Sequence, residues 1–317
     1  MSLATPVTDP AQSPAPAPAA LPSTTQIDPD DFTYLRVLVK QGSAIELEDG
    51  KEYLVVTRLA PVLRTEGLAT ISDLVAALRR PGADRLRDAV IDAMTTNETS
   101  FFRDLHPFEA LESAIIPTIL ADKAPHEALT IWCGASSSGQ EPHSLAMMCA
   151  DRFPELLPHR LKIVATDLSP TMVARCAAGR YTQFEVNRGL PARALVRHFE
   201  QDGPDWVLRR EIRDLVEVRP LNLMGMWSGI PRCDIVMLRN VLIYFSLDDK
   251  REILGRIRRD VLHPGGVLML GSSETTLNID DEYLRREVGK TVCYETPSTR
   301  RPTFPPTSAV QGGDPCN

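Results

Sequence analysis

The sequence predicts an α/β protein whose main domain is a doubly wound, mainly parallel sheet, preceded by a small helical domain. From residue 129 onward, apolar segments that read as strands alternate with segments of helical periodicity. Strands are expected at LTIWCG, LKIVATDL, RCDIVMLRN and VLMLGS, and a last strand at about residues 290 to 296. Because such sheets bind ligands at the carboxyl ends of their strands, we expect the functional site there.

The helical domain is expected at residues 32 to 96, where the apolar residues recur with helical periodicity. About four short helices fit this stretch, and Thr70 with Asp73 forms a capping pattern at the start of one of them. Residues 97 to 128 then form an interdomain segment with a linker helix. The basic residues of the helical domain suit either an acidic partner or an ordinary solvated surface, and the second explanation is the commoner one.

Three other stretches depart from this plan. Residues 181 to 221 interrupt the alternation, and their apolar and charged residues alternate in a way that predicts a small antiparallel β-subdomain inserted in the main domain. Residues 1 to 31 and 297 to 317 are rich in Pro and small residues. Such segments bury too little apolar surface to offset the entropy of ordering, so we expect a disordered arm and a disordered tail.

The composition excludes several classes of protein. A net charge of -7 and a pI of about 5.5 argue against a nucleic-acid partner. The 6 cysteines include no C-x-x-C pair, so neither a metal site nor a disulfide framework is expected. No apolar segment is long enough to span a membrane, and the start of the chain does not resemble a signal peptide. We therefore expect a cytoplasmic protein without membrane insertion.

The stretch LTIWCGASSSGQEP, residues 129 to 142, is the strongest candidate for a ligand site. A buried strand that runs into small residues and then a helix lets a nucleotide-like ligand approach the backbone. Its spacing fits neither a P-loop nor a dinucleotide fingerprint. The alternative is an ordinary strand-to-helix turn. Glu141 in the first helical turn could bind a ribose hydroxyl or an ammonium group, or it could simply suit the helix dipole.

Other polar residues stand at the ends of predicted strands or between the domains. Asp167, which ends ATD, could accept hydrogen bonds from both ribose hydroxyls of a nucleoside, or it could cap the next helix. Arg239, Asn240 and Tyr244 follow a buried strand, and burying them without a ligand would leave donors unsatisfied. The segment TTNETSFFRD could be a capped helix start with its phenylalanines in the core. It could instead be a lid over a cofactor, with Arg103 directed at an anion.

A set of motifs then supports a family assignment. TTNETSFFRD, WCGASSSGQEPHSLAM, ATDLSPTMVARCAAGRY, NRGL, RPLNL, LRNVLIYF and HPGGVLMLGSSET occur in this order. In order and spacing the chain resembles the CheR-type chemotaxis receptor methyltransferases over roughly residues 32 to 296. The resemblance implies an S-adenosylmethionine-dependent protein-glutamate O-methyltransferase with a Rossmann-like catalytic domain at residues 129 to 296. Its implied substrates are the cytoplasmic domains of chemoreceptors, and we expect it to act as a monomer.

The resemblance also implies roles for individual residues. Arg103 and Tyr244 would lie near the transferred methyl group, and Arg58 and Arg64 of a basic helix would meet the acidic receptor. The residues expected to bind the cofactor are Asn97, Thr99, Arg103, Glu141, Asp167, Asn222, Leu223, Arg239 and Asn240.

Three positions depart from the common pattern: Gln140 replaces a frequent glutamate, His143 a usual tyrosine and Leu238 a frequent cysteine. Gln keeps its hydrogen-bonding capacity and Leu alters only strand packing, so cofactor binding is expected to survive. The short DGPDW connection puts a peptide-tethering role of the β-subdomain in doubt. The alternatives to a receptor methyltransferase are a non-catalytic cofactor-binding signalling scaffold and a carboxyl methyltransferase with another acceptor.

Overall fold

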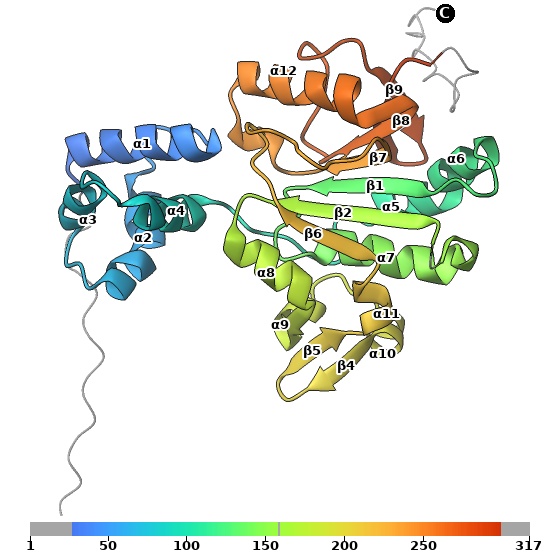
Figure 1. The fold of residues 1–317 in the computed structure, drawn as a ribbon, viewed down its shortest axis with the longest axis horizontal. Coiled ribbons are helices and arrows are strands. Elements are labelled where there is room, and N and C mark those ends of the chain that lie inside the picture. The colour runs from blue at the N-terminus through green and yellow to red at the C-terminus, as the bar shows by residue number, and fades with distance from the viewer. Residues whose placement is uncertain (1–26, 158, 299–317) are drawn as a thin grey trace, which may run out of the picture.

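The computed structural model describes residues 27–157 and 159–298, which form a helical domain beside a sheet domain (Figure 1). The arm and tail predicted at the two ends lie outside the described residues, except for 27–31 and 297–298. Helix α1 begins inside the predicted arm, because the Asp28 carboxylate accepts the N–H groups of Asp30 and Asp31. The helical domain consists of α1 (Pro29–Ser43), α2 (Glu52–Glu66), α3 (Ile71–Leu78) and α4 (Asp84–Met94).

These four helices share one apolar core. Leu35, Val55, Leu59 and Leu74 are almost completely buried within it. The predicted capping box of α3 is confirmed, since Thr70 and Asp73 each accept a backbone N–H of the other. The helical domain therefore has a hydrophobic core of its own.

The predicted α/β sheet is confirmed and has the order β6-β2-β1-β7-β8-β10-β9 within the described residues. Strands β6, β2, β1, β7 and β8 are parallel, and β10 and β9 continue the sheet antiparallel. The strands are β1 (Leu129–Gly134), β2 (Leu161–Asp167), β6 (Val216–Pro220), β7 (Cys233–Leu238), β8 (Leu262–Leu270), β9 (Leu284–Val288) and β10 (Thr291–Glu295).

Alternate residues of β1 face opposite layers. Ile131 and Cys133 pack with the core that includes Leu145, whereas Trp132 packs with the core that includes Ile253 and Leu254. Both layers are helical, so the strand is buried on both faces and reads as a continuous apolar run. The helical elements of the sheet domain are α5 (His106–Ala110), the π-helix η1 (Leu111–Ile115), α6 (Ile116–Asp122), α7 (Gln140–Arg152), η2 (Pro154–Leu156), α8 (Pro170–Ala178), η3 (Leu242–Tyr244), α12 (Leu247–Arg256) and the π-helix η4 (Ile257–Val261).

The predicted insertion is partly confirmed. Strands β3 (Arg180–Thr182), β5 (Asp205–Leu208) and β4 (Phe199–Asp202) form a small antiparallel sheet, accompanied by α9 (Gln183–Val186), α10 (Ala192–His198) and α11 (Arg210–Arg213). Antiparallel pairing is wrong for the last part of the predicted stretch, because β6 pairs in parallel with β2 as an edge of the main sheet. Its alternating pattern reflects this edge position, where one face remains solvated.

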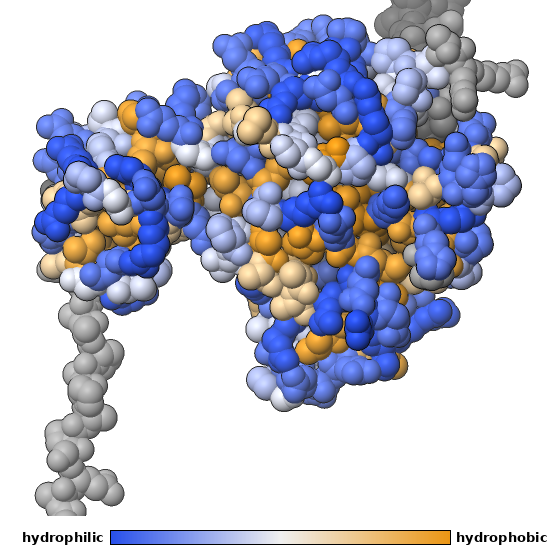
Figure 2. Space-filling view, viewed as in Figure 1, coloured by the Kyte–Doolittle hydropathy of each residue, from blue (hydrophilic) through white to orange (hydrophobic). Residues whose placement is uncertain are grey.

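The hydrophobic residues visible on this face lie toward its middle. In Figure 2 the rim of the view is mainly hydrophilic, and hydrophobic residues are seen within the helical domain, at the junction of the domains and across the middle of the sheet domain. None of the helices in the described part of the chain is long and apolar enough to cross a membrane.

His143 is a buried polar residue in the first half of α7. Its Nδ1 lies 2.6 Å from the Tyr181 hydroxyl, and that hydroxyl donates to the carbonyl oxygen of Ser138. Because the single phenolic hydrogen is used on Ser138, His143 Nδ1–H must be the donor to Tyr181. Burial, helped by the charge of Arg213, lowers the pKa of His143 to about 3. The side chain therefore stays neutral and joins α7 to the β-subdomain.

This pKa predicts a loss of stability in acid. His143 has a pKa of about 6.5 in the unfolded chain, so it binds a proton there below that pH, whereas in the folded protein it stays neutral down to about pH 3. The free energy of unfolding therefore falls as the pH falls from 6.5 toward 3. Between pH 7.5 and pH 5 this residue should remove about 2 kcal/mol. Urea titrations of the wild type and His143→Gln at both pH values measure it. Equal pH dependence of the two proteins would contradict the assignment.

Candidate functional site

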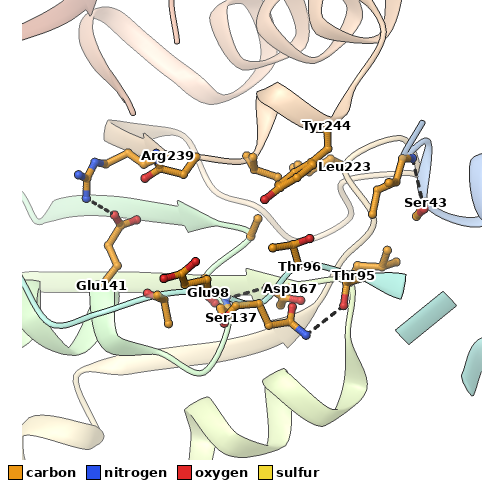
Figure 3. A pocket seen from close by; sticks show the side chains of 18 of the residues that line it. Ser43, Thr95, Thr96, Glu98, Ser137, Glu141, Asp167, Leu223, Arg239 and Tyr244 are labelled. Carbon is orange, nitrogen blue, oxygen red and sulfur yellow. Dashed lines mark hydrogen bonds and ion pairs between the residues drawn. The ribbon is translucent and has the colours of Figure 1, made fainter. Parts of the chain in front are cut away.

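A cavity lies at the junction of the domains, at the carboxyl ends of β1, β2 and β7. Figure 3 shows Tyr244 and Leu223 facing Glu141, Ser137 and Asp167 across it. This is the switch point of the sheet, because the chain continues from β1 to β2 on one side and later places β7 on the other. The residues that line the cavity are Ser43, Ile45, Thr95, Thr96, Asn97, Glu98, Thr99, Arg103, Ala135, Ser136, Ser137, Glu141, Asp167, Leu168, Leu221, Asn222, Leu223, Arg239, Asn240, Val241, Tyr244 and Phe245.

The loop between β1 and α7 has an unusual backbone. Ala135, Ser137 and Gly139 have φ values of 53°, 51° and 95°, all in the left-handed region. A Cβ atom on Gly139 would lie 2.6 Å from Cys176 Sγ, so this position requires glycine for space as well as for conformation. The loop therefore packs closely on α8 and leaves the small side chains at the cavity wall, as the predicted ligand site requires.

Asp167 joins this loop to the end of β2. Its carboxylate accepts the N–H of Ser137 at 2.7 Å and the N–H of Ser169 at 2.9 Å, one on each oxygen. Burial raises the pKa of Asp167, and the two backbone hydrogen bonds oppose that rise. The cap of α8 is Ser169, not Asp167, because its hydroxyl accepts the N–H of Met172. A carboxylate offers about four acceptor positions, so Asp167 retains acceptor capacity toward the cavity.

Arg239 is the central cation of the site. Its side chain is 1% exposed, and its guanidinium donates to Glu141 at 2.7 Å and to Asp104 at 2.6 Å. It also donates to the carbonyl oxygen of Arg103 at 2.9 Å. The group therefore connects the end of β7, the first turn of α7 and the interdomain segment. Arg239 lines the cavity as predicted, but most of its hydrogen-bonding capacity is directed at the protein itself.

The interdomain segment places Phe101 in the core, as one predicted interpretation requires, but it does not begin a capped helix. Phe101 is completely buried and makes edge-to-face contacts with Tyr181 and Phe199. Phe102, Asp104 and Leu105 have positive φ values of 46°, 66° and 47°, so the segment is a strained turn and not a capped helix start.

Three of the predicted cofactor-binding residues in this segment, Asn97, Thr99 and Arg103, line the cavity. The carbonyl oxygen of Asn97 accepts the Ser137 hydroxyl at 2.8 Å, which fixes the segment to the loop after β1. The Arg103 guanidinium donates to the carbonyl oxygen of Glu98 at 3.1 Å. The segment therefore reaches from the apolar core to the cavity wall.

The opposite wall comes from the segments after β6 and β7. Asn222 Nδ2 donates to the carbonyl oxygen of Gly42 at 2.8 Å, which joins the sheet domain to the end of α1. Asn240 has a φ of 59°, and its Oδ1 is buried without a hydrogen-bond partner among the described residues. Leu223 and Tyr244 complete this wall.

The two predicted receptor-binding arginines differ in their surroundings. Arg58 donates to the carbonyl oxygen of Met94 at 2.6 Å and to the Thr96 hydroxyl at 2.8 Å, so it holds the end of α4 against the next segment. Arg64 is exposed in the last turn of α2. Only Arg64 therefore presents a guanidinium that is free of hydrogen bonds to described residues.

Several cavity residues were not predicted. Ser43 and Ile45 reach the cavity because Ala44 ends α1 in the left-handed conformation. Ser137, whose amide and hydroxyl both bond to the cavity wall, lies within the predicted loop but was not singled out. The serine run of the loop could have indicated Ser137, whereas no local pattern marks the end of α1 as part of a distant site.

Comparison with known proteins gives consistent matches over both domains. The CheR methyltransferase all-alpha domain matches residues 30–95, and the CheR methyltransferase SAM-binding domain matches residues 97–291. The chemotaxis protein methyltransferase Cher2 of Pseudomonas putida is 40% identical over 84% of this chain and 97% of its own length. Chemotaxis protein methyltransferase 1 of Pseudomonas aeruginosa is 40% identical over 83% and 97%. The chemotaxis protein methyltransferase of Vibrio parahaemolyticus is 41% identical over 75% and 86%.

The contacts of Arg239 with Glu141 and Asp104 predict that substitution of Arg239 strongly lowers the stability of the protein. Arg239→Met keeps much of the volume but leaves Glu141 and Asp104 without their cation, so the free energy of unfolding should fall by about 3 kcal/mol. Arg251→Met, at an exposed ion pair with Asp248, is the matched control and should change it by less than about 1 kcal/mol. Urea denaturation followed by circular dichroism measures both. Similar losses in the two variants would show that the buried cluster has no special weight.

Proposed function

The chain belongs to the CheR methyltransferase family, whose cofactor is S-adenosylmethionine, and we propose that it methylates glutamate side chains in the cytoplasmic domains of chemotaxis receptors. The products are glutamate methyl esters and S-adenosylhomocysteine. The observation that carries this proposal is one cavity, lined by both domains, that combines the carboxylates of Glu141 and Asp167 with Arg103 and Tyr244. The names of the relatives, which are chemotaxis protein methyltransferases, support the choice of receptor.

The polar groups of the cavity suit this cofactor. Asn240 Oδ1 is a buried acceptor in need of a donor, and Glu141 Oε1 accepts no hydrogen bond from the described residues. In our proposal the Asp167 carboxylate accepts the ribose hydroxyls, and Glu141 accepts from the ammonium group of the methionine part. Asn97, Thr99, Asn222, Leu223, Arg239 and Asn240 complete the cofactor pocket.

The reaction needs positioning more than proton transfer. A glutamate side chain has an unperturbed pKa of about 4.3, so the acceptor is already a carboxylate at neutral pH. The bound cofactor supplies an electrophilic methyl group on a sulfonium. An acceptor oxygen forms a bond to that methyl carbon as the carbon–sulfur bond breaks, and the electron pair stays on sulfur. Alignment of the two reactants can contribute about 7 to 11 kcal/mol.

Arg103 and Tyr244 orient the acceptor in this scheme. The Arg103 guanidinium has one hydrogen bond to a backbone carbonyl, which leaves other N–H groups for an incoming carboxylate. The Tyr244 ring projects into the cavity from the opposite wall (Figure 3). The exposed Arg64 contributes to docking of an acidic receptor helix, whereas Arg58 acts by holding Thr96 at the cavity. We propose a monomer that works in the cytoplasm.

Asp167 provides the test of the cofactor site. Asp167→Asn keeps the size of the side chain but replaces one acceptor oxygen by a donor, so calorimetry should show binding of S-adenosylhomocysteine weakened about ten- to a hundredfold. The control is Asp92→Asn. Asp92 accepts a hydrogen bond from Thr171 in α8, the helix that follows Asp167, but it does not line the cavity. If Asp167→Asn bound S-adenosylhomocysteine with wild-type affinity, Asp167 would not be a cofactor-binding residue.

The acceptor is tested with radiolabelled cofactor and purified receptor cytoplasmic domains. We expect label on the receptor that is released by base as methanol, and turnover in Arg103→Ala reduced about a hundredfold or more while the affinity for S-adenosylhomocysteine changes less. A cofactor-binding scaffold would bind the cofactor but label no protein. A methyltransferase with another acceptor would leave the receptors unlabelled and label a different protein or a small molecule. Either result would replace the receptor assignment.

A further inference from the structure

The turn after β7, residues 240 to 244, lines the cavity, and the side chain of Glu274 binds its backbone. Asn240, at the start of the turn, and Tyr244, at its end, both line the cavity. In the proposed function Asn240 belongs to the cofactor pocket, and Tyr244 orients the acceptor. Glu274, which follows β8, accepts the N–H of Asn240 at 2.7 Å and the N–H of Ile243 at 3.3 Å. It also accepts the N–H of Gly271 at 2.8 Å, within its own loop.

We propose that Glu274 is a positioning residue of the methyl transfer: its carboxylate fixes the turn of residues 240 to 244, so that Asn240 faces the cofactor and Tyr244 faces the acceptor. The inference rests on the proposed function and adds a residue that contacts neither reactant.

The local geometry explains why a carboxylate is needed. Asn240 has a φ of 59°, in the left-handed region that asparagine enters more readily than most non-glycine residues, and Glu274 holds its N–H there. Three backbone N–H groups converge on one side chain, and a charged acceptor binds them more strongly than a neutral one. Among the described residues no basic side chain forms an ion pair with Glu274. Its carboxylate is instead bound by these three backbone N–H groups.

Gly271 packs closely against both the carboxylate and the turn. A Cβ atom on Gly271 would lie 2.6 Å from Asn240 Nδ2, 2.8 Å from Glu274 Oε2 and 2.9 Å from the amide nitrogen of Asn240. The residue that follows β8, Gly271, therefore has to be glycine for the carboxylate to approach the turn. The position of the 240 to 244 turn is thus set from β8 as well as from β7.

Two variants of different severity test this proposal. Glu274→Ala removes all three acceptor contacts, whereas Glu274→Gln keeps one carbonyl oxygen that can still accept from Asn240 and Gly271. The matched control is Glu282→Gln in the same connection between β8 and β9, because Glu282 pairs with Arg258 and accepts no N–H from the turn. All variants are compared at a temperature where circular dichroism shows them folded.

We expect Glu274→Ala to weaken S-adenosylhomocysteine binding about ten- to a hundredfold in calorimetry and to lower the methyl-transfer turnover by at least as much. Glu274→Gln should lie between Glu274→Ala and the wild type, and Glu282→Gln should match the wild type in both measurements. In a Tyr244→Phe background the loss of turnover caused by Glu274→Ala should shrink, because both changes act on one turn.

Wild-type affinity and turnover in folded Glu274→Ala would overturn the proposal. Losses that are fully additive with Tyr244→Phe would also overturn it, because Glu274 would then not act through that residue. The binding arm needs no acceptor. If the wild type labels no receptor, the proposed function fails, while the affinity of the Glu274 variants for S-adenosylhomocysteine still decides whether this carboxylate sets the cofactor wall.

Discussion

The structure depends on the pairing of one buried guanidinium. A buried arginine is costly unless it is paired, and Arg239 finds its partners only where β7, the start of α7 and the interdomain segment come together. Its Nη1 and Nη2 donate to these partners, whereas its Nε has no partner among the described residues. The requirement works in both directions. Glu141 and Asp104 are held in place by the same cation, so the acidic side of the cavity and the strained turn after Phe101 have a common anchor.

The helical domain is attached to this anchored site largely through backbone groups. The carbonyl oxygen of Gly42 accepts from Asn222, the N–H of Glu46 donates to the carbonyl oxygen of Tyr244, and Asn97 accepts from Ser137 through its carbonyl oxygen. Such contacts depend on the path of the chain more than on side-chain identity. The outer surface of the helical domain can therefore change in sequence without loss of these contacts.

The sequence was sufficient for features that depend on local pattern. The buried strands, the Thr70 capping box and the glycine-containing loop are set by residues close together in the chain. The family resemblance indicated 10 of the 22 residues that line the cavity. Features set by distant partners were missed. Nothing local shows that β6 pairs with β2, that β9 extends the sheet, or that Glu274 supports Asn240. The pairing of buried Arg239 with Asp104 also depends on segments more than a hundred residues apart.

The strain in this structure is concentrated where the cavity is built. Of the non-glycine residues described with positive φ, Phe102, Asp104, Leu105, Ala135, Ser137 and Asn240 all lie in the segments that form its walls. Each such residue costs about 1 to 3 kcal/mol and persists only when neighbouring contacts hold it. Arg239, Asp167 and Glu274 supply those contacts from regular strands or from residues just beyond them. The walls are therefore held in one conformation before a ligand arrives, and binding need not supply the energy to order them.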